Sequence, residues 1–297
     1  MIRLGHPTPS ARMAIAASLL LAPFPAACSR PPDEPPALDI TIATANLSNN
    51  TSQTYEDPGI RILQALRPDI LAIQEFRCPS GSPEDLARRL FGPDVHFHRE
   101  KGARLPNGII SRFPILAAGQ WHDPHVRNRD FAWATLDIPG PKPLHVVSVH
   151  LLQTRAADRP PQARLLLDLI RRHFPATDYV VLCGDLNISS RRAEAFTVLA
   201  AELDDSRQPV DQNGNPNTNA ERNRPYDVVL PNPELAQHHA PTRLGSLVFP
   251  DGLVFDTRLW DPPPPPAEWG DTARDMQHLP VMKTFRIPLA VPGTTAP

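Results

Sequence analysis

The feature of this sequence that most constrains its fold is a series of short apolar segments that end in polar side chains. Residues 38–42 (LDITI) alternate as a half-buried strand does, and residues 69–73 (DILAI) have the composition of a buried strand. Because such strands expose apolar faces, other layers must cover them. Further strands are expected at 107–112, 131–138, 144–150, 179–184, 226–230, 252–256 and 281–287.

Three helices are expected between these strands. Residues 59–67 have apolar side chains at helical spacing, and a second helix begins near Pro160 and Pro161, which suit a first turn. A third is expected over 191–202 with Ser190 as its N-cap. Because strands outnumber helices and only some alternate with them, the pattern predicts an α/β fold in which two mixed β-sheets pack face to face with helices outside.

The first 28 residues have the pattern of an export signal peptide. Arg3 and Arg12 give a basic start, residues 13–24 are apolar, and small residues precede Cys28. The apolar run is shorter than the about 20 residues that a membrane-spanning helix needs. We therefore expect an exported protein that resides in the periplasm, on a membrane or outside the cell.

The signal peptide is followed by a Pro-rich linker at 29–37 and then by the domain at 38–297. Cys28 follows two alanines, which resembles a bacterial lipoprotein cleavage site. Pro25 stands where such sites usually carry leucine, so a lipid anchor through Cys28 and simple secretion both stay open. Two other segments are interpreted as surface loops: the proline run at 262–266 and the polar stretch at 211–223, which lacks the glycine and glutamate positions of an EF-hand calcium loop.

Net charge and cysteine content exclude some classes of function. The chain carries a net charge of -2, and all three charged residues among the first thirty are arginines, so the remainder is more acidic. That balance gives no broad electrostatic attraction for nucleic acid, and phosphate chemistry must come from a local site. Beyond Cys28, only Cys78 and Cys183 remain; a disulfide between them is left open, and no Cys/His cluster indicates zinc.

Polar side chains of the kinds that bind metals or phosphate, or transfer protons, recur where the apolar strands stop or start. Any one of them has an ordinary explanation as a cap or turn residue, but six separate positions of this kind indicate a site. They are Asn46, Gln74 with Glu75, His150, Asp185 with Asn187, Asp227, and His278.

The ordered set of motifs resembles the endonuclease/exonuclease/phosphatase superfamily, the fold of DNase I. The resemblance covers nearly everything from residue 38 to residue 287 and implies a DNase I-like four-layer α/β sandwich with the active site at one edge of the two sheets. The motifs that carry it are TIATANLS, PDILAIQEF, NGIISRFPI, HVVSVHLL, VVLCGDLNIS, NRPYDVVL and QHLPV.

The resemblance also implies the metal ligands. Phosphodiester hydrolysis needs a cation to screen phosphate oxygens, donors for the developing charge and a base for the attacking water. Glu75 matches the main carboxylate ligand and Asn46 a neutral oxygen ligand. The expected ion is Mg²⁺, with Mn²⁺ or Ca²⁺ as alternatives.

The resemblance assigns roles to the other polar positions. Asp185 orients the water, Asn187 binds a phosphate oxygen, and His150 donates to the phosphate or leaving oxygen. Asp185 and Asn187, two residues apart, are expected to point to the same side if the backbone stays extended. Asp227 pairs with His278, which assists the attack of water on phosphorus.

Gln277 departs from the family pattern, which has an aspartate just before this histidine. A glutamine supplies no charge to a second metal position, and whether Asp275 compensates is left open. The sequence thus predicts an exported, metal-dependent phosphoesterase, a monomer, whose substrate is a phosphodiester as for a nuclease. The alternatives are a phosphodiesterase or phosphatase acting on phospholipids or on inositol or other sugar phosphates, and a non-catalytic binding module.

Overall fold

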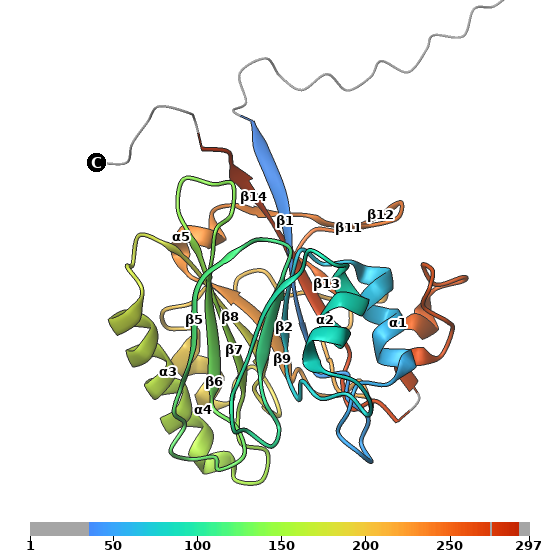
Figure 1. Ribbon diagram of the computed structural model, residues 1–297, viewed down its shortest axis with the longest axis horizontal. Coiled ribbons are helices and arrows are strands. Elements are labelled where there is room, and N and C mark those ends of the chain that lie inside the picture. Colours follow the sequence, from blue (N-terminus) through green and yellow to red (C-terminus); the bar gives the residue numbers. More distant parts are fainter. Residues whose placement is uncertain (1–35, 274, 291–297) are drawn as a thin grey trace, which may run out of the picture. The chain divides into compact units, whose positions relative to one another are not determined.

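The computed structural model describes residues 36–273 and 275–290 and contains two mixed β-sheets (Figure 1). The expected signal peptide, Cys28 and most of the linker lie outside the described residues. In the first sheet the strand order is β10-β14-β1-β2-β4-β3, with β13 paired to β14. Its strands are β1 (Ala37–Ala45), β2 (Ile70–Ile73), β3 (His96–Arg99), β4 (Gly108–Ser111), β10 (His239–Ala240), β13 (Leu253–Val254) and β14 (Val281–Pro288).

The second sheet has the order β5-β6-β7-β8-β9, and a separate hairpin joins β11 to β12. The strands of this sheet are β5 (Ile115–Trp121), β6 (Phe131–Leu136), β7 (Leu144–His150), β8 (Tyr179–Asp185) and β9 (Asp227–Pro231). The hairpin consists of β11 (Thr242–Leu244) and β12 (Leu247–Phe249).

The four longer helices lie on the outer faces of the two sheets (Figure 1), whereas the short helix at Pro233–Ala236 buries Leu235 in the core between the sheets. None of the described helices is long and apolar enough to cross a membrane. The α-helices are α1 (Asp57–Leu66), α2 (Pro83–Phe91), α3 (Arg159–His173), α4 (Glu194–Leu199) and α5 (Pro233–Ala236), and short 3₁₀ turns cover Ala156–Asp158, Thr257–Leu259 and Asp271–Ala273.

Three apolar cores hold four layers together, because alternate residues of a strand face opposite sides of its sheet. On β1, Ile40 and Ile42 belong to the central core between the sheets, whereas Ala43 and Ala45 face α1 and α2. The third core joins the second sheet to α3 and α4. The predicted four-layer sandwich is therefore confirmed.

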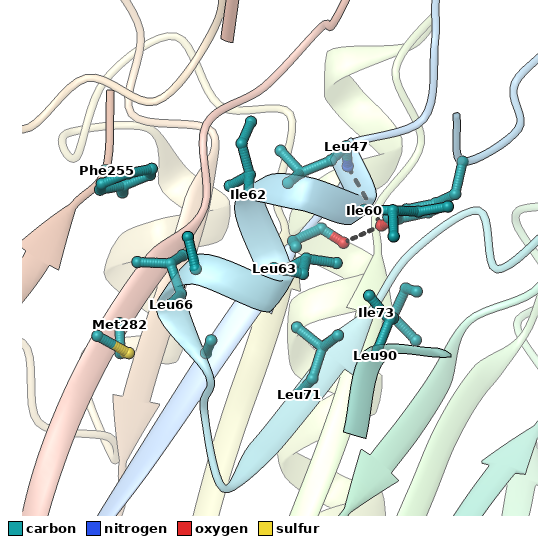
Figure 2. Close-up of a cluster of buried hydrophobic side chains, with 14 of the residues drawn as sticks. Leu47, Ile60, Ile62, Leu63, Leu66, Leu71, Ile73, Leu90, Phe255 and Met282 are labelled. Carbon is teal, nitrogen blue, oxygen red and sulfur yellow. Dashed lines mark hydrogen bonds between the residues drawn. The ribbon is translucent and has the colours of Figure 1, made fainter. Parts of the chain in front are cut away.

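Helix α1 shows how the sequence produces this packing. Its apolar residues recur at helical spacing, so that Ile62, Leu63 and Leu66 share one buried face. Figure 2 shows this face over Leu71 and Ile73 of β2. Burying one such side chain contributes about 1.5–3 kcal/mol. The contact fixes the position of β2, and with it the polar residues that follow this strand.

Two parallel strand pairs bring the polar strand ends to one edge. β1 runs parallel to β2 with α1 between them in sequence, and β7 runs parallel to β8 with α3 between them. The carboxyl ends of parallel neighbours meet at the same edge of a sheet, and antiparallel β9 and β14 begin there, with Asp227 opposite Asp185 and Val281 opposite Thr44. A hydrogen bond of 3.0 Å from Gln74 Nε2 to Ser148 Oγ joins the two sheets near this edge.

Some local expectations are wrong. Helix α4 begins at Glu194 after Ala193, not after Ser190, whose hydroxyl accepts a bond from the N–H of Arg192 instead. The strand expected at 252–256 is only two residues long, and it shares one edge of β14 with β10 while β1 pairs with the other edge. Cys78 and Cys183 are both free, so the disulfide that was left open does not form. Helix α2 and strands β3 and β5 were not predicted from the sequence.

Lys283 generates a prediction about stability. Its side chain is buried on β14 without an ion pair or hydrogen bond to the described residues, and this burial lowers its pKa to about 8. Because the folded-state pKa lies below the unfolded one, stability falls as pH drops through about 8 and is fully restored only above the unfolded pKa. Lys283→Met should raise the free energy of unfolding at pH 7 by roughly 3 kcal/mol.

The measurement is urea unfolding of both proteins at pH 7 and again near the unfolded pKa of lysine, where the gain should shrink. The exposed Lys101→Met serves as the control and should change little at either pH. A Lys283→Met protein that is less stable than the parent at pH 7 would contradict this account.

Candidate active site

The polar strand ends surround a cavity of about 320 Å³ at the shared edge of the sheets. Residues from both sheets and from the segment before β14 form its walls, so the cavity exists only when all of these elements are in place. Among the residues predicted from sequence, it is lined by Asn46, Glu75, His150, Asp185, Asn187 and His278. Asp227, the remaining predicted residue, lies directly behind His278.

Asp227 and His278 form the expected pair. The Nδ1 atom of His278 lies 2.8 Å from Oδ2 of Asp227, although the two residues are 51 positions apart. Both are buried. Thr218 fixes the carboxylate by donating to the same Oδ2 (2.7 Å), while its hydroxyl oxygen accepts the Asp227 N–H (2.9 Å). With Nδ1 occupied in this way, only Nε2 of the imidazole is left to act in the cavity.

The charge of His278 depends on its neighbours. Burial opposes protonation, but the carboxylates of Asp227 and Asp185 outweigh this effect and raise the pKa of His278 to about 9. Nε2 lies 3.5 Å from Oδ2 of Asp185. In the protein without substrate or cation, His278 is therefore mainly protonated at pH 7, and it becomes a base when it gives up this proton.

Asp185 lies at the centre of the site. Burial raises the pKa of its carboxyl group, against the opposing charge of His278. Its Oδ2 lies 3.2 Å from Nε2 of His150 and accepts bonds from the side-chain amides of Asn46 (3.4 Å) and Asn187 (3.1 Å). These partners fix the orientation of the carboxylate, which a group that holds a water molecule in one place requires.

Asp185 and Asn187 do come together, but not through an extended backbone. Asn187 has a φ of 50°, in the left-handed region, and its N–H donates to Oδ1 of Asp185 (2.7 Å) as in an Asx turn. This turn places the side-chain amide of Asn187 within hydrogen-bond distance of the Asp185 carboxylate (3.1 Å). The expected proximity is confirmed, whereas the geometry assumed for it is wrong.

His150 is neutral in this setting. Burial lowers its pKa well below the ordinary value, and the positive charges of Arg129 and His278 add to that effect. Its Nδ1 is buried without a hydrogen-bond partner among the described residues, 3.9 Å from Glu75 Oε1. A buried ring nitrogen without a partner is costly, so Nδ1 is the ring atom left for a bound substrate, and it donates to a substrate oxygen only when the single ring proton is on Nδ1.

Glu75 and Asn46, the expected metal ligands, both line the cavity. Ser48 Oγ donates to Oε2 of Glu75 (2.5 Å) and lies 3.4 Å from Oδ1 of Asn46, so both side-chain oxygens lie near this hydroxyl. Glu75 has a φ of 52°. A non-glycine residue in this region costs on the order of 1–3 kcal/mol, and such residues cluster at functional sites. The strained turn directs the carboxylate into the cavity rather than along the strand.

The residues fit a divalent cation. Three buried carboxylates, those of Glu75, Asp185 and Asp227, face the positive charges of His278 and Arg129, because His150 is neutral. The balance is negative, and no lysine or arginine of the described chain forms an ion pair with Glu75. A hard cation held by one carboxylate and one amide oxygen would offset this charge.

A second group of metal-binding residue types lies beside this position. Ligand atoms of Asp185, Asp227 and His278 lie within 4.8 Å of one another. A cation there would have to displace the proton of His278 and compete with its bond to Asp227. The oxygen pair of Asn46 and Glu75 is therefore the better metal position.

Gln277 and Asp275 do not recreate the missing acidic ligand. Gln277 lines the cavity with an uncharged side chain, and its backbone carbonyl accepts a bond from the N–H of Ala220 (2.9 Å). Asp275 is exposed and accepts a bond from the hydroxyl of Thr51 (2.9 Å). The question left open by the sequence is thereby answered, since Asp275 does not compensate for Gln277.

Three residues of the site were missed. Thr218 belongs to the polar loop at 211–223, Ser48 follows Asn46 in NLS, and Arg129 precedes β6. Arg129 is buried beneath the cavity and donates to the carbonyl groups of His150 (2.5 Å) and Leu151 (2.8 Å). Hydroxyl residues near Asn46 and Asp227 were a usable signal, but nothing in the sequence pattern singled out Arg129.

Comparison with protein families identifies the class. The chain matches the model of the Endonuclease/Exonuclease/phosphatase family over residues 43–274, and it belongs to that family, whose members are generally hydrolytic phosphoesterases. A comparison with curated proteins gives no significant match.

Solved structures show the same fold at low sequence identity. An endonuclease/exonuclease/phosphatase from Beutenbergia cavernae DSM 12333 is 20% identical with a TM-score of 0.56, covering 84% of this chain and 72% of that one. An AP endonuclease from Archaeoglobus fulgidus is 18% identical with a TM-score of 0.57, covering 83% and 99%. Beta toxin from Staphylococcus aureus is 13% identical with a TM-score of 0.52, covering 82% and 99%.

The His278–Asp227 pair generates a prediction about pH dependence. If His278 acts as a base, kcat/KM for a phosphodiester should rise with pH as the imidazole loses its proton. Asp227→Asn removes the carboxylate that raises the pKa of His278, so the rising limb should move to lower pH. Activity at the optimum should fall by about 10²-fold or more.

Thr218→Val is the matched control for this experiment. It removes one bond to Asp227 but keeps the carboxylate, so the midpoint of the pH profile should stay near that of the parent. Full pH profiles of kcat/KM for the parent, Asp227→Asn and Thr218→Val proteins test whether Asp227 sets the pKa of His278. An Asp227→Asn profile with an unshifted limb would contradict the assigned pairing.

Proposed function

We propose that this protein is a divalent-metal-dependent phosphodiesterase with nuclease-like activity. The observation that carries the proposal is the convergence of a His–Asp pair, a buried water-orienting aspartate and a two-oxygen metal position in one cavity. These five residues come from five separate segments of the chain. A fold maintained only for binding would not need a protonated histidine held between two buried carboxylates.

The chain's own residues suit the steps of hydrolysis. Asp185 and Nε2 of His278 lie 3.5 Å apart and face the same cavity, where they can hold a water and take its proton. The Asn187 amide donates to Leu151 O (3.1 Å) and Asp185 Oδ2 (3.1 Å), and it would exchange one of these bonds for a bond to a phosphate oxygen. Nδ1 of His150 has no partner among the described residues and faces the cavity. A cation bound by Glu75 and Asn46 would screen phosphate charge. Arg129 supports His150 from below through its backbone carbonyl.

The surface around the site favours a nucleic-acid substrate over a phospholipid. A lipid substrate calls for apolar side chains near the cavity. None of the exposed large apolar residues of the described chain lines it; they are Leu38, Leu116, Leu247, Val248 and Trp269. Phospholipid or inositol-phosphate hydrolysis therefore remains the second candidate.

We also propose that the protein is exported and acts as a monomer. The support for export is the sequence pattern of residues 1–28, with Cys28 as the candidate for lipid attachment. Labelling cells with a radioactive fatty acid and fractionating them would test the anchor. A Cys28→Ser protein should lose any label and appear in the soluble exported fraction.

The enzymatic proposal is tested by substrate profiling. Purified protein should hydrolyse DNA, RNA or bis(4-nitrophenyl) phosphate with Mg²⁺ or Mn²⁺ and should stop when EDTA is added. Glu75→Ala and His278→Ala should each lower kcat by about 10²–10⁴-fold, because they remove the metal ligand and the proton-transfer group.

Two surface changes serve as matched controls, Glu84→Ala on α2 and His96→Ala on β3, both of which are exposed. They should leave the rate unchanged. The absence of EDTA-sensitive hydrolysis of every phosphodiester would refute the catalytic proposal and favour a binding module. Hydrolysis restricted to phospholipid or inositol-phosphate substrates would favour the second candidate.

A further inference from the structure

A group of unpaired cations lies beside the catalytic cavity. Lys101 and Arg127 are exposed, and their side chains form no ion pair or hydrogen bond with the described residues. We call these two residues the cationic platform. Several exposed arginines elsewhere are paired with acids, for example Arg88 with Glu84 and Arg164 with Glu194. Unlike these arginines, the two platform residues have no acidic partner among the described residues.

The acids near the platform are engaged elsewhere. Asp123, which lines the same cavity, accepts the N–H of His125 (2.9 Å) and a bond from the side-chain amide of Gln162. Asp130 accepts bonds from the side-chain amide of Gln120 (2.9 Å) and the N–H of Asp123 (3.0 Å), and it lies 3.1 Å from Nδ1 of His122. Glu100 is buried, and burial raises its pKa to about 8, so it is mostly neutral at pH 7. These acids leave Lys101 and Arg127 free to meet an anion.

Hydrogen bonds hold the two platform loops in place. The N–H of Leu105 donates to the carbonyl of Asn128 (2.9 Å), and the side-chain amide of Asn107 donates to the carbonyl of Asp130 (2.7 Å). Gln120 accepts the N–H of Lys101 at 2.7 Å. The loops before β4 and after β5 thus form one supported surface, and a ligand pays little ordering cost there.

The platform faces a cavity that adjoins the catalytic one. This cavity has a volume of about 500 Å³ and is lined by Lys101, His122 and Arg127. Arg129 lines both cavities. Arg104, another exposed arginine without an ion pair, lies in the wall of the catalytic cavity at the junction. Positive side chains therefore continue outward from the point where the scissile phosphate would lie.

We propose that the cationic platform binds a second phosphate group of the substrate, so that the substrate is a nucleic-acid strand rather than an isolated phosphodiester. The inference rests on the proposed phosphodiesterase function. Because the chain as a whole is acidic, a polyanion gains attraction only where local cations outnumber free acids. No exposed large apolar residue of the described chain lines either cavity, which favours a strand over a lipid carrying several phosphates.

The test compares a substrate with one phosphate to a substrate with several. The variant is Lys101→Gln/Arg127→Gln, and the control is Arg192→Gln/Arg243→Gln, which removes two other exposed arginines that lack ion pairs. At low salt, KM for octathymidylate should rise about 5- to 20-fold in the platform variant only, with a weaker salt dependence. The kcat/KM for bis(4-nitrophenyl) phosphate should stay unchanged in all proteins.

A second readout separates this inference from the catalytic proposal. Fluorescence anisotropy of labelled octathymidylate in EDTA reports binding without turnover, and the platform variant should bind about 5- to 20-fold more weakly than the parent and the control. Equal affinity and equal KM in all three proteins would overturn the inference even if the enzyme is active. Platform-dependent hydrolysis of phosphatidylinositol bisphosphate vesicles, with none of octathymidylate, would overturn it in favour of a lipid. If no diester is hydrolysed, the catalytic proposal fails. The anisotropy measurement alone then decides whether the cationic platform binds octathymidylate.

Discussion

The hydrogen bond between His278 and Asp227 depends on the whole architecture. Asp227 begins β9 in the second sheet, whereas His278 precedes β14 in the first sheet, so the bond connects the two sheets. It can form only if both sheets end at the same edge and in the correct register. The central core between the sheets provides that alignment, because alternate residues of β1 and β8 interlock there.

The same constraint explains why the site can hold so much charge. Glu75, Asp185 and Asp227 are almost completely buried, and removing a carboxylate from water is costly unless it is bonded or paired. Each of the three accepts a side-chain hydrogen bond, from Ser48, Asn187 and Thr218 respectively. The negative balance that remains is what a cation at Glu75 would offset. The cationic platform lies outside this buried group, so the two regions can act on different phosphates.

Much of the fold and most of the site could be predicted from the sequence. The strand pattern identified β1, β2, β7 and β8 together with the polar residues that end them, and the structure shows that parallel pairing brings these strand ends to one edge. Local rules failed where tertiary contacts decide the outcome. Ser190 has a side chain that suits a helix N-cap. Its hydroxyl instead accepts the N–H of Arg192, before the helix begins at Glu194. The strand expected at 252–256 has only two paired residues, and β10 pairs with the next residues on the same edge of β14.

Supporting residues were harder to predict than the reactive ones. Arg129 acts through backbone carbonyl groups of His150 and Leu151, and no motif encodes a partner of that kind. Thr218 lies in a loop whose polar composition suggested only solvent exposure, yet it holds Asp227 in place. The backbone conformation was equally hard to predict, since nothing in the sequence indicates that Glu75 and Asn187 have φ values in the left-handed region.

The most direct test of the account is a crystal structure with Mn²⁺ and phosphate, in which anomalous scattering locates the ion. The account predicts one ion bound by Glu75 and Asn46, with the phosphate in contact with Asn187 and His150. The bond between His278 and Asp227 should stay intact. An ion bound between Asp185 and Asp227 with that bond broken, or phosphate outside the cavity, would contradict the assignment of the site.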